Sequence, residues 1–339
     1  MANPASSPEA QRGYRGARLL LGVAALLIGA QLYRSVLNLS VFRAFALTVV
    51  SLFLEAFPFL LLGSAAAVMV RRFLPARWMA TLAQRLGIYG VPLVALTGLV
   101  APVCECAIVP TVRGLRDRGL PLPYAITVLV SVPVVNPIVI ASTVAAFPGR
   151  GDLILARFLG GYAVAVLTGL VFSLVSGKEH SHSVSQDPPP GERHYTERKQ
   201  RGGVVMILQG TLQEFLEVSR YFVVGALLSG LVQATVPPDR IAYLGTSILA
   251  ATAVMISLAF VLSVCSEADA FIGKAFLPLL PAPSVIAFLV FGPMLDLKNT
   301  GMIRRVISRR QLALLAATLV VLVTGLAAGL HVLWGGFSI

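Results

Sequence analysis

Long stretches with few or no charged residues recur along the whole chain, and they constrain its fold more than any other feature. A helix needs about 20 apolar residues to cross a bilayer, and most of these stretches reach that length. Only 12% of the residues are charged and 57% are hydrophobic, whereas roughly a quarter of a soluble domain is charged. The sequence therefore predicts an all-α polytopic membrane protein. The stretches are Leu19–Tyr33, Ala44–Val70, Leu86–Val112, Leu120–Phe147, Phe158–Gly177, Tyr221–Pro238, Ile241–Ser266, Ala275–Leu295 and Gln311–Ile339.

The first of these stretches, Leu19–Tyr33, is the shortest. No small-residue cleavage site follows it, so we expect a retained transmembrane helix rather than a signal peptide.

The formal net charge of +12 is typical of topology signals at helix ends in a chain this apolar, and no basic–aromatic motif indicates nucleic-acid binding. The three cysteines all lie in apolar stretches, which argues against an extracellular disulfide framework.

Two parts of the chain resemble each other. FLEAFPFLLLGSAAAVMVRRFLP (53–75) aligns with FLEVSRYFVVGALLSGLVQATVP (215–237) at an offset of 162, and two later blocks follow at offsets of 161 and 160. A nearly constant offset over three blocks predicts two homologous halves. We divide the chain into a tail with the first helix (1–41), a first half (42–177), a polar flexible linker (178–203) and a second half (204–339).

The distribution of Lys and Arg favours halves of opposite orientation. If the stretches Leu86–Val112 and Ile241–Ser266 re-enter the membrane instead of crossing it, each half has three spans and the repeats are inverted. Positive residues then gather at the amino end, in the linker and in segments 71–85, 113–118 and 298–310, which the positive-inside rule makes cytoplasmic. If every stretch crosses, the bias is weak. We expect inverted repeats in the plasma membrane, a layout found in secondary transporters.

Two cysteines flank a glutamate, Glu105, in the apolar sequence GLVAPVCECAIVP (98–110). Pro102 and Pro110 cannot continue a helical hydrogen-bond ladder, so we expect unwound backbone in which Cys104 and Cys106 point the same way. Such backbone at membrane depth lines a cavity or is buried in protein. Thiolates are soft ligands, so the pair predicts a binding site for a solute or a soft metal. Cysteines that act as small buried hydrophobes are the alternative.

The second half carries SVCSEADAF (263–271) at the matching position, with Cys265, Glu267 and Asp269. Inserting an acid at membrane depth costs roughly 2.5–3.5 kcal/mol on insertion scales, so an acid found there is a candidate functional residue. We therefore predict that these three residues bind the solute together with the first cysteine motif. The alternative is that both acids lie in headgroup water.

Glu55 and Glu217 lie at equivalent positions near the start of each half. Both are candidates for a proton-coupling site. For Glu217, an ordinary helix pair with Arg220, three residues later, is the structural alternative.

A third pair of segments, SVPVVNP (131–137) and GPMLDLKNTG (292–301), interrupts apolar helices. Pro133, Pro137 and Pro293 are the expected breaks, and Asn136 and Asp296 each follow a proline by three positions. We expect these side chains and the freed carbonyls to form the wall of the site opposite the cysteines. Tolerated kinks are the alternative.

These motifs resemble a known family. APVCECAIVPTVRGL, VSVPVVNP, SVCSEADAF and GPMLDLKN are similar to segments of the ArsP-type predicted permeases, which include trivalent organoarsenical exporters and YraQ-like permeases. Pro102, Cys104 and Cys106 match the family pattern Pro-x-Cys-Ser-Cys, and Glu105 takes the place of the serine. CSEADAF is more similar to the YraQ-like branch.

The resemblance and the residues together predict a permease rather than an enzyme. The chain has no GxxxxGK[ST] loop for ATP, so we expect a secondary transporter that exports a small thiol-reactive solute, such as a trivalent organoarsenical or a soft metal species. An intramembrane thiol or redox enzyme and a non-transporting subunit of a membrane complex remain the alternatives. We expect no cofactor. The expected partners are the lipid bilayer, the solute, and a second copy or an accessory membrane subunit, and no nucleic acid.

Overall fold

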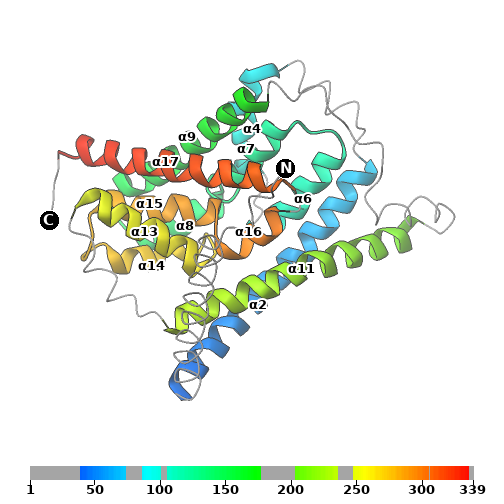
Figure 1. Ribbon diagram of the computed structural model, residues 1–339, viewed down its shortest axis with the longest axis horizontal. Coiled ribbons are helices and arrows are strands. Elements are labelled where there is room, and N and C mark those ends of the chain that lie inside the picture. Colours follow the sequence, from blue (N-terminus) through cyan, green and yellow to red (C-terminus); the bar gives the residue numbers. More distant parts are fainter. Residues whose placement is uncertain are drawn as a thin grey trace, which may run out of the picture.

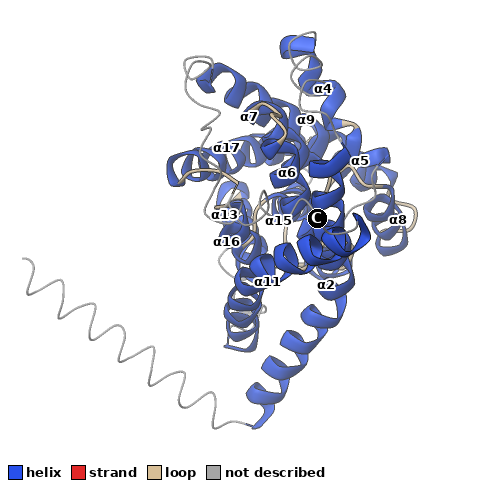
Figure 2. Cartoon of the chain, turned by 90° about the vertical axis from the view of Figure 1, so that its right-hand side faces the viewer, coloured by secondary structure: helices blue, strands red, loops and turns tan. Residues whose placement is uncertain are grey.

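The structure is a computed structural model of the chain that describes residues 39–73, 86–100, 105–176, 203–235, 247–304 and 306–335. Within these ranges the regular secondary structure is entirely helical, without strands (Figure 2). Four stretches there are long and apolar enough to cross a membrane: Phe45–Met69, Gly151–Val175, Ala282–Ile303 and Arg309–Leu333. The prediction of an all-α membrane protein is confirmed. The first predicted helix, Leu19–Tyr33, and the linker up to residue 202 lie outside the described residues.

Two long helices, α2 (Leu39–Phe73) and α11 (Gly203–Thr235), pack against each other along the lower part of Figure 1. The ring of Phe53 meets that of Phe222 edge to face with centroids 5.6 Å apart, and Phe57 meets Phe215 at 5.3 Å. Residue numbers rise along α2 as they fall along α11, so the helices are antiparallel. They are the matching first helices of the two predicted halves. Their opposite directions support the inverted repeat, which stays a prediction.

The remaining helices form a bundle beside this pair (Figure 1). In the first predicted half they are η2 (Gly87–Tyr89), α4 (Gly90–Ala95), α5 (Thr97–Val100), α6 (Glu105–Asp117), α7 (Leu122–Ser131), α8 (Pro137–Ala146) and α9 (Gly151–Ser176). In the second they are α13 (Ile248–Leu262), α14 (Asp269–Phe276), α15 (Ala282–Met294), α16 (Leu297–Ile303) and α17 (Arg309–Leu333).

The centre of the bundle consists of two short helices at matching positions. α7 packs against α4 and α9, and α15 packs in the same manner against α13 and α17. Every residue of α7 and all of α15 after Ala282 are buried. α9 also contacts α15 and α17, so it links the two predicted halves. The apolar side chains of α7 and α15 therefore form a protein core and are not exposed to lipid.

The bundle is interrupted at matching places. α7 ends at Ser131, Pro133 lies in the turn that follows, and Pro137 is the first residue of α8. α15 ends just after Pro293, and extended backbone at Leu295 and Asp296 leads into α16. α13 ends at Leu262, where Ser263 adopts a left-handed φ of 47°. A non-helical segment, residues 263–268, connects it to α14.

Pro110 does not break the chain as we expected. It lies inside α6, which begins at Glu105 and continues to Asp117, so Cys106 is in a helix and not in extended backbone. A proline removes the N–H that would bond to the carbonyl four residues earlier, which is that of Cys106. The hydroxyl of Thr111 donates to the Ala107 carbonyl at 2.8 Å, and α6 packs closely against α2. This packing offsets the lost backbone bond.

Candidate functional site

Glu105, the residue between the two motif cysteines, begins α6. The positive end of a helix dipole favours an acid at this position. Its Oε1 contacts the Nζ of Lys298 in an ion pair in which both side chains are 1% exposed. Lys298 lies on α16, in the other predicted half. The start of α6 therefore lies against α16 inside the protein.

A second acid shares this lysine. Asp296 precedes α16, and its Oδ1 accepts a hydrogen bond from the Asn299 amide at 2.6 Å, as an N-cap does. Its Oδ2 lies 3.5 Å from Lys298 Nζ. Lys298 also donates to the Ser263 carbonyl at 3.0 Å, and the Ser263 hydroxyl accepts from the Leu297 amide at 3.1 Å. The interruption after α13 is thereby joined to the start of α16.

Of the three cysteines, only Cys265 is described in full. Cys104 and Pro102 lie outside the described residues, and for Cys106 the structure describes only the backbone, in the first turn of α6. Cys265 is buried in the segment after α13. Its carbonyl accepts bonds from the amides of Ala268 at 3.1 Å and Asp269 at 3.0 Å. That segment is therefore an ordered turn leading into α14.

Asp269, the first residue of α14, pairs with Arg157 on α9. The Nη2 atom of Arg157 lies 2.8 and 2.9 Å from the two carboxylate oxygens, and the side chains are 2% and 3% exposed. The guanidinium also donates to the Thr143 hydroxyl at 2.8 Å and to the Ser266 carbonyl at 3.1 Å. Glu267 is partly exposed beside it. This second buried ion pair also joins the two predicted halves.

Two glycines at matching positions bring the long helices close to the Glu105–Lys298 pair. A Cβ atom on Gly63 of α2 would lie 2.5 Å from the Ala107 Cα on α6. A Cβ atom on Gly225 of α11 would lie 2.5 Å from the Cα of Lys298 itself. Because real Cβ atoms do not approach so closely, only glycine fits here. α2 thus fixes the position of the helix that carries the acid, and α11 that of the helix that carries the lysine.

Asn136 has the same local role as Asp296, 160 positions later. It precedes α8, is buried, and accepts a hydrogen bond from the Ile138 amide at 2.9 Å. Each polar residue in the third pair of motifs therefore satisfies the start of a short helix. That role accounts for the residue type, and whether either also contacts a solute stays a prediction.

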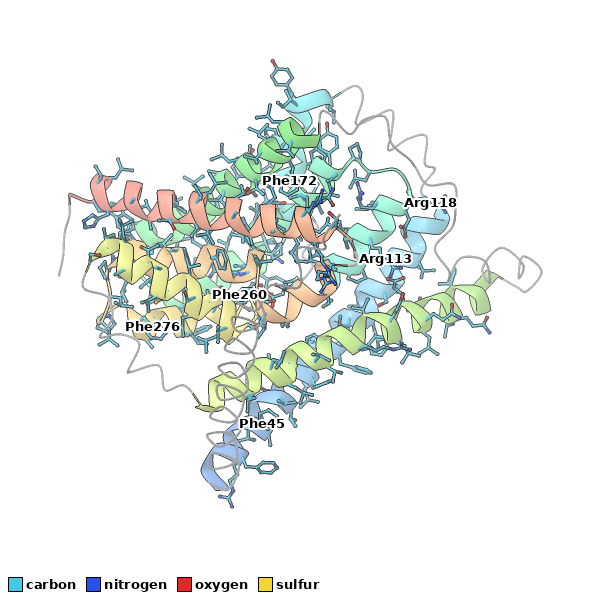
Figure 3. All side chains as sticks on the ribbon, viewed as in Figure 1. Phe45, Arg113, Arg118, Phe172, Phe260 and Phe276 are labelled. Atoms are coloured by element: carbon cyan, nitrogen blue, oxygen red, sulfur yellow. The ribbon has the colours of Figure 1, made fainter. Side chains whose placement is uncertain are left out.

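Glu217 pairs with Arg113 of α6, and not with the arginine three residues along its own helix. The Nη1 of Arg113 lies 3.0 Å from Glu217 Oε2 and 3.2 Å from Glu214 Oε1, in the region where α6 packs against α2 (Figure 3). Arg220 is exposed. The cluster connects α11 to α6 and resembles a structural link between helices. The side chain of Glu55 lies outside the described residues.

The sequence model of a family described as predicted permeases, of the ArsP type, matches residues 41–331. The chain belongs to this family. It is 34% identical to the UPF0718 protein YcgR of Bacillus subtilis over 278 residues, 81% of this chain and 92% of that protein.

A second relative of this ArsP-type permease comes from Streptococcus mutans and is named "Putative two-component membrane permease complex subunit". The two are 31% identical over 255 residues, 75% of this chain and 84% of that protein. No solved structure matches the sequence. The family match covers both predicted halves and the motif residues, so the resemblance seen in the motifs extends over most of the permease.

Sequence reasoning missed the bases of this site. The sequence pattern assigns Lys298 to a cytoplasmic segment, but this lysine is buried on α16. The same pattern gives no role to Arg157, which lies at the edge of an apolar stretch. A signal was present for Lys298, because it follows Asp296 by two residues in an otherwise apolar segment, and a basic residue at membrane depth needs a partner. The positive charge counted for the segment 298–310 therefore includes one lysine that is buried in the protein.

Within the part of the chain that the structure describes, no three His, Cys, Asp or Glu side chains lie close enough to hold a metal ion. The expectation of a soft-metal site rests on Cys104 and Cys106, whose side chains are outside that part. What the described residues provide is two buried ion pairs across the interface of the predicted halves. Transporters built from repeats bind their substrates at such an interface.

Proposed function

We propose that this protein is a secondary permease that exports a small thiol-reactive solute, a trivalent organoarsenical or a soft metal species. The observation that carries the proposal is the buried contact between Glu105 and Lys298. It brings the acid of the cysteine motif to a residue of the other predicted half. The motif is therefore well placed to meet a solute between the halves, where alternating access requires the binding site to be.

The residues divide into two roles in this proposal. Cys104 and Cys106, with Cys265 from the matching segment, supply sulfur ligands to the solute, since soft ligands favour soft acceptors. Glu105, Asp296, Glu267 and Asp269 supply charge around them. Lys298 and Arg157 offset part of that charge and connect the halves. Arg113 restrains Glu217, so Glu217 is a weaker candidate for proton coupling than the sequence suggested.

We further propose that the permease lies in the plasma membrane with its amino end and linker in the cytoplasm. The excess of Lys and Arg on that side supports this orientation. The antiparallel course of α2 and α11 supports inverted halves, because matching helices of inverted repeats run in opposite directions. Membership of a permease family favours transport over catalysis.

A resistance screen in a host lacking its own efflux systems tests the solute. Cells that produce wild-type protein, Cys104→Ser/Cys106→Ser or the control variant Lys274→Met are exposed to methylated trivalent arsenicals, arsenite, and zinc, cadmium, cobalt and copper salts. Lys274 is an exposed residue of α14. We expect wild type and the control to protect against one solute and the double variant to lose the protection. Equal growth of all strains on every solute, with the protein present in the membrane, would contradict the proposal.

The relative from Streptococcus mutans supports a second proposal, that this chain is one component of a two-component permease. In that case the isolated protein in liposomes does not move the solute, and activity appears only when a second membrane protein is added. Uptake by liposomes that contain the purified chain alone would exclude a strict need for a second component.

A further inference from the structure

Two buried acids share one lysine in the Glu105–Lys298–Asp296 cluster. Lys298 Nζ contacts Glu105 Oε1 and lies 3.5 Å from Asp296 Oδ2. Asp296 is 0% exposed, and its Oδ2 accepts no hydrogen bond from any described residue. The other aspartate pair is different, because both carboxylate oxygens of Asp269 lie within 3 Å of the Arg157 guanidinium. Asp296 therefore shares its counter-charge, the ammonium of Lys298, with Glu105.

Burial makes this imbalance costly. A charged carboxylate inside a protein needs a partner, or it takes up a proton and becomes neutral. With a proton on Asp296 Oδ2, the ammonium of Lys298 balances Glu105, and the three groups together are neutral. Without that proton, two carboxylates compete for the same ammonium.

We propose that Asp296 binds the coupling proton of this permease and that Lys298 changes its partner with the state of that proton. The inference rests on the proposed transport function and names the coupling site within it. When Asp296 is protonated, Lys298 stays on Glu105 and holds α6 against α16. When the proton leaves, Asp296 draws Lys298 away from Glu105, and the contact between the predicted halves weakens.

In the part of the chain that the structure describes, few charged residues lie on the helices that pack around Asp296. α13 and α15, which border the site, carry no charged residue. α6 contributes Glu105 at its start and Arg113 two turns later, where Arg113 is held by Glu214 and Glu217 of α11. Its other charged residues, Arg116 and Asp117, lie at the far end of the helix. α11 also carries Arg220, which is exposed.

Thermal unfolding of the purified full-length protein, measured between pH 5.5 and pH 8.5, tests the proposal without transport. An aspartic acid in an unfolded chain releases its proton near pH 4. If the folded protein keeps that proton to higher pH, its stability falls as the pH rises through this range. We expect the wild-type midpoint to fall on the order of 5 °C and Asp296→Asn, which cannot release a proton, to show a smaller fall than the wild type.

Asp152→Asn is the matched control. Asp152 is exposed and hydrogen-bonded to Arg150, so it is ionised in both states over this range, and the variant should keep the wild-type pH dependence. Asp296→Asn with an unchanged pH dependence would overturn the proposal.

Should Asp296→Asn fail to fold, a carbodiimide that modifies protonated carboxyl groups gives a second measurement on the wild-type protein. We expect peptide mass spectrometry to find Asp296 modified more at pH 6 than at pH 8.5. Modification that is absent or equal at the two pH values would overturn the proposal. A flat resistance screen together with a pH-dependent Asp296 would reject the proposed solute and leave the proton site intact, so the two failures are distinguishable.

Discussion

The guanidinium of Arg157 lies within 3 Å of both carboxylate oxygens of Asp269, and neither side chain reaches the surface. The two residues come from different predicted halves. Because one base serves one acid with two short contacts, this pair is well suited to hold the halves together. The Glu105–Lys298 pair lies between the halves as well, but its lysine is shared.

Removing Arg157 should therefore lower the folding stability strongly. Arg157→Ala leaves a buried carboxylate without its counter-charge, which costs roughly 3–5 kcal/mol of folding stability, and we expect a much lower melting midpoint in detergent. Arg150→Ala removes an exposed pair with Asp152, whose side chains are 43% and 42% exposed, and should change stability by about 0–1 kcal/mol. Similar midpoints for the two variants would contradict the buried pair.

The stability of the folded protein should depend on the opposite charges of Glu105 and Lys298. Glu105→Lys and Lys298→Glu each bring like charges together in a buried site, so both single variants should lose stability and resistance to the solute. The exchanged double variant should recover part of the stability, because opposite charges meet again. Melting midpoints of the four proteins give the coupling energy, and purely additive effects would exclude a direct interaction.

The two matching glycines of the long helices should not tolerate a methyl group. Gly63→Ala and Gly225→Ala place a Cβ 2.5 Å from backbone atoms of α6 and α16, and we expect each to cost about 1–3 kcal/mol through overpacking. Gly325→Ala and Gly329→Ala are controls in α17, where a Cβ meets no atom within 4 Å. These should stabilise the helix by roughly 0.5–1 kcal/mol, which thermal unfolding can resolve.

Orientation can be measured with cysteines placed at two loop positions. Inverted repeats with a re-entrant cysteine segment put residue 116 in the cytoplasm and residue 150 outside. In intact cells, a membrane-impermeant maleimide should label Arg150→Cys, and Arg116→Cys only after the cells are opened. The reverse pattern, with Arg116→Cys labelled in intact cells and Arg150→Cys only after the cells are opened, would favour parallel halves in which every apolar stretch crosses.

Much of the fold could be predicted from the sequence because the bilayer imposes local requirements. Apolar length identified the helical membrane class, and the constant offset of matching residues predicted the halves. The segments around Asn136 and Asp296 were expected to interrupt helices, and the structure places both residues at helix starts. A carboxylate or amide that caps a helix bonds to backbone a few residues away, so this role can be predicted from the adjacent sequence.

The partners of the buried charges could not be predicted in this way. The sequence offers Arg220, three residues away, as an alternative partner for Glu217, but Arg113 of another helix pairs with it. It also places Lys298 at the cytoplasmic side, although this lysine balances an acid in the other predicted half. The sequence by itself determined the helical class, the interruptions before Asn136 and Asp296 and the positions of the acids, because these depend on neighbours along the chain. Only the tertiary structure decided which base meets which acid, because an ion pair depends on distance in space, and helix packing sets that distance.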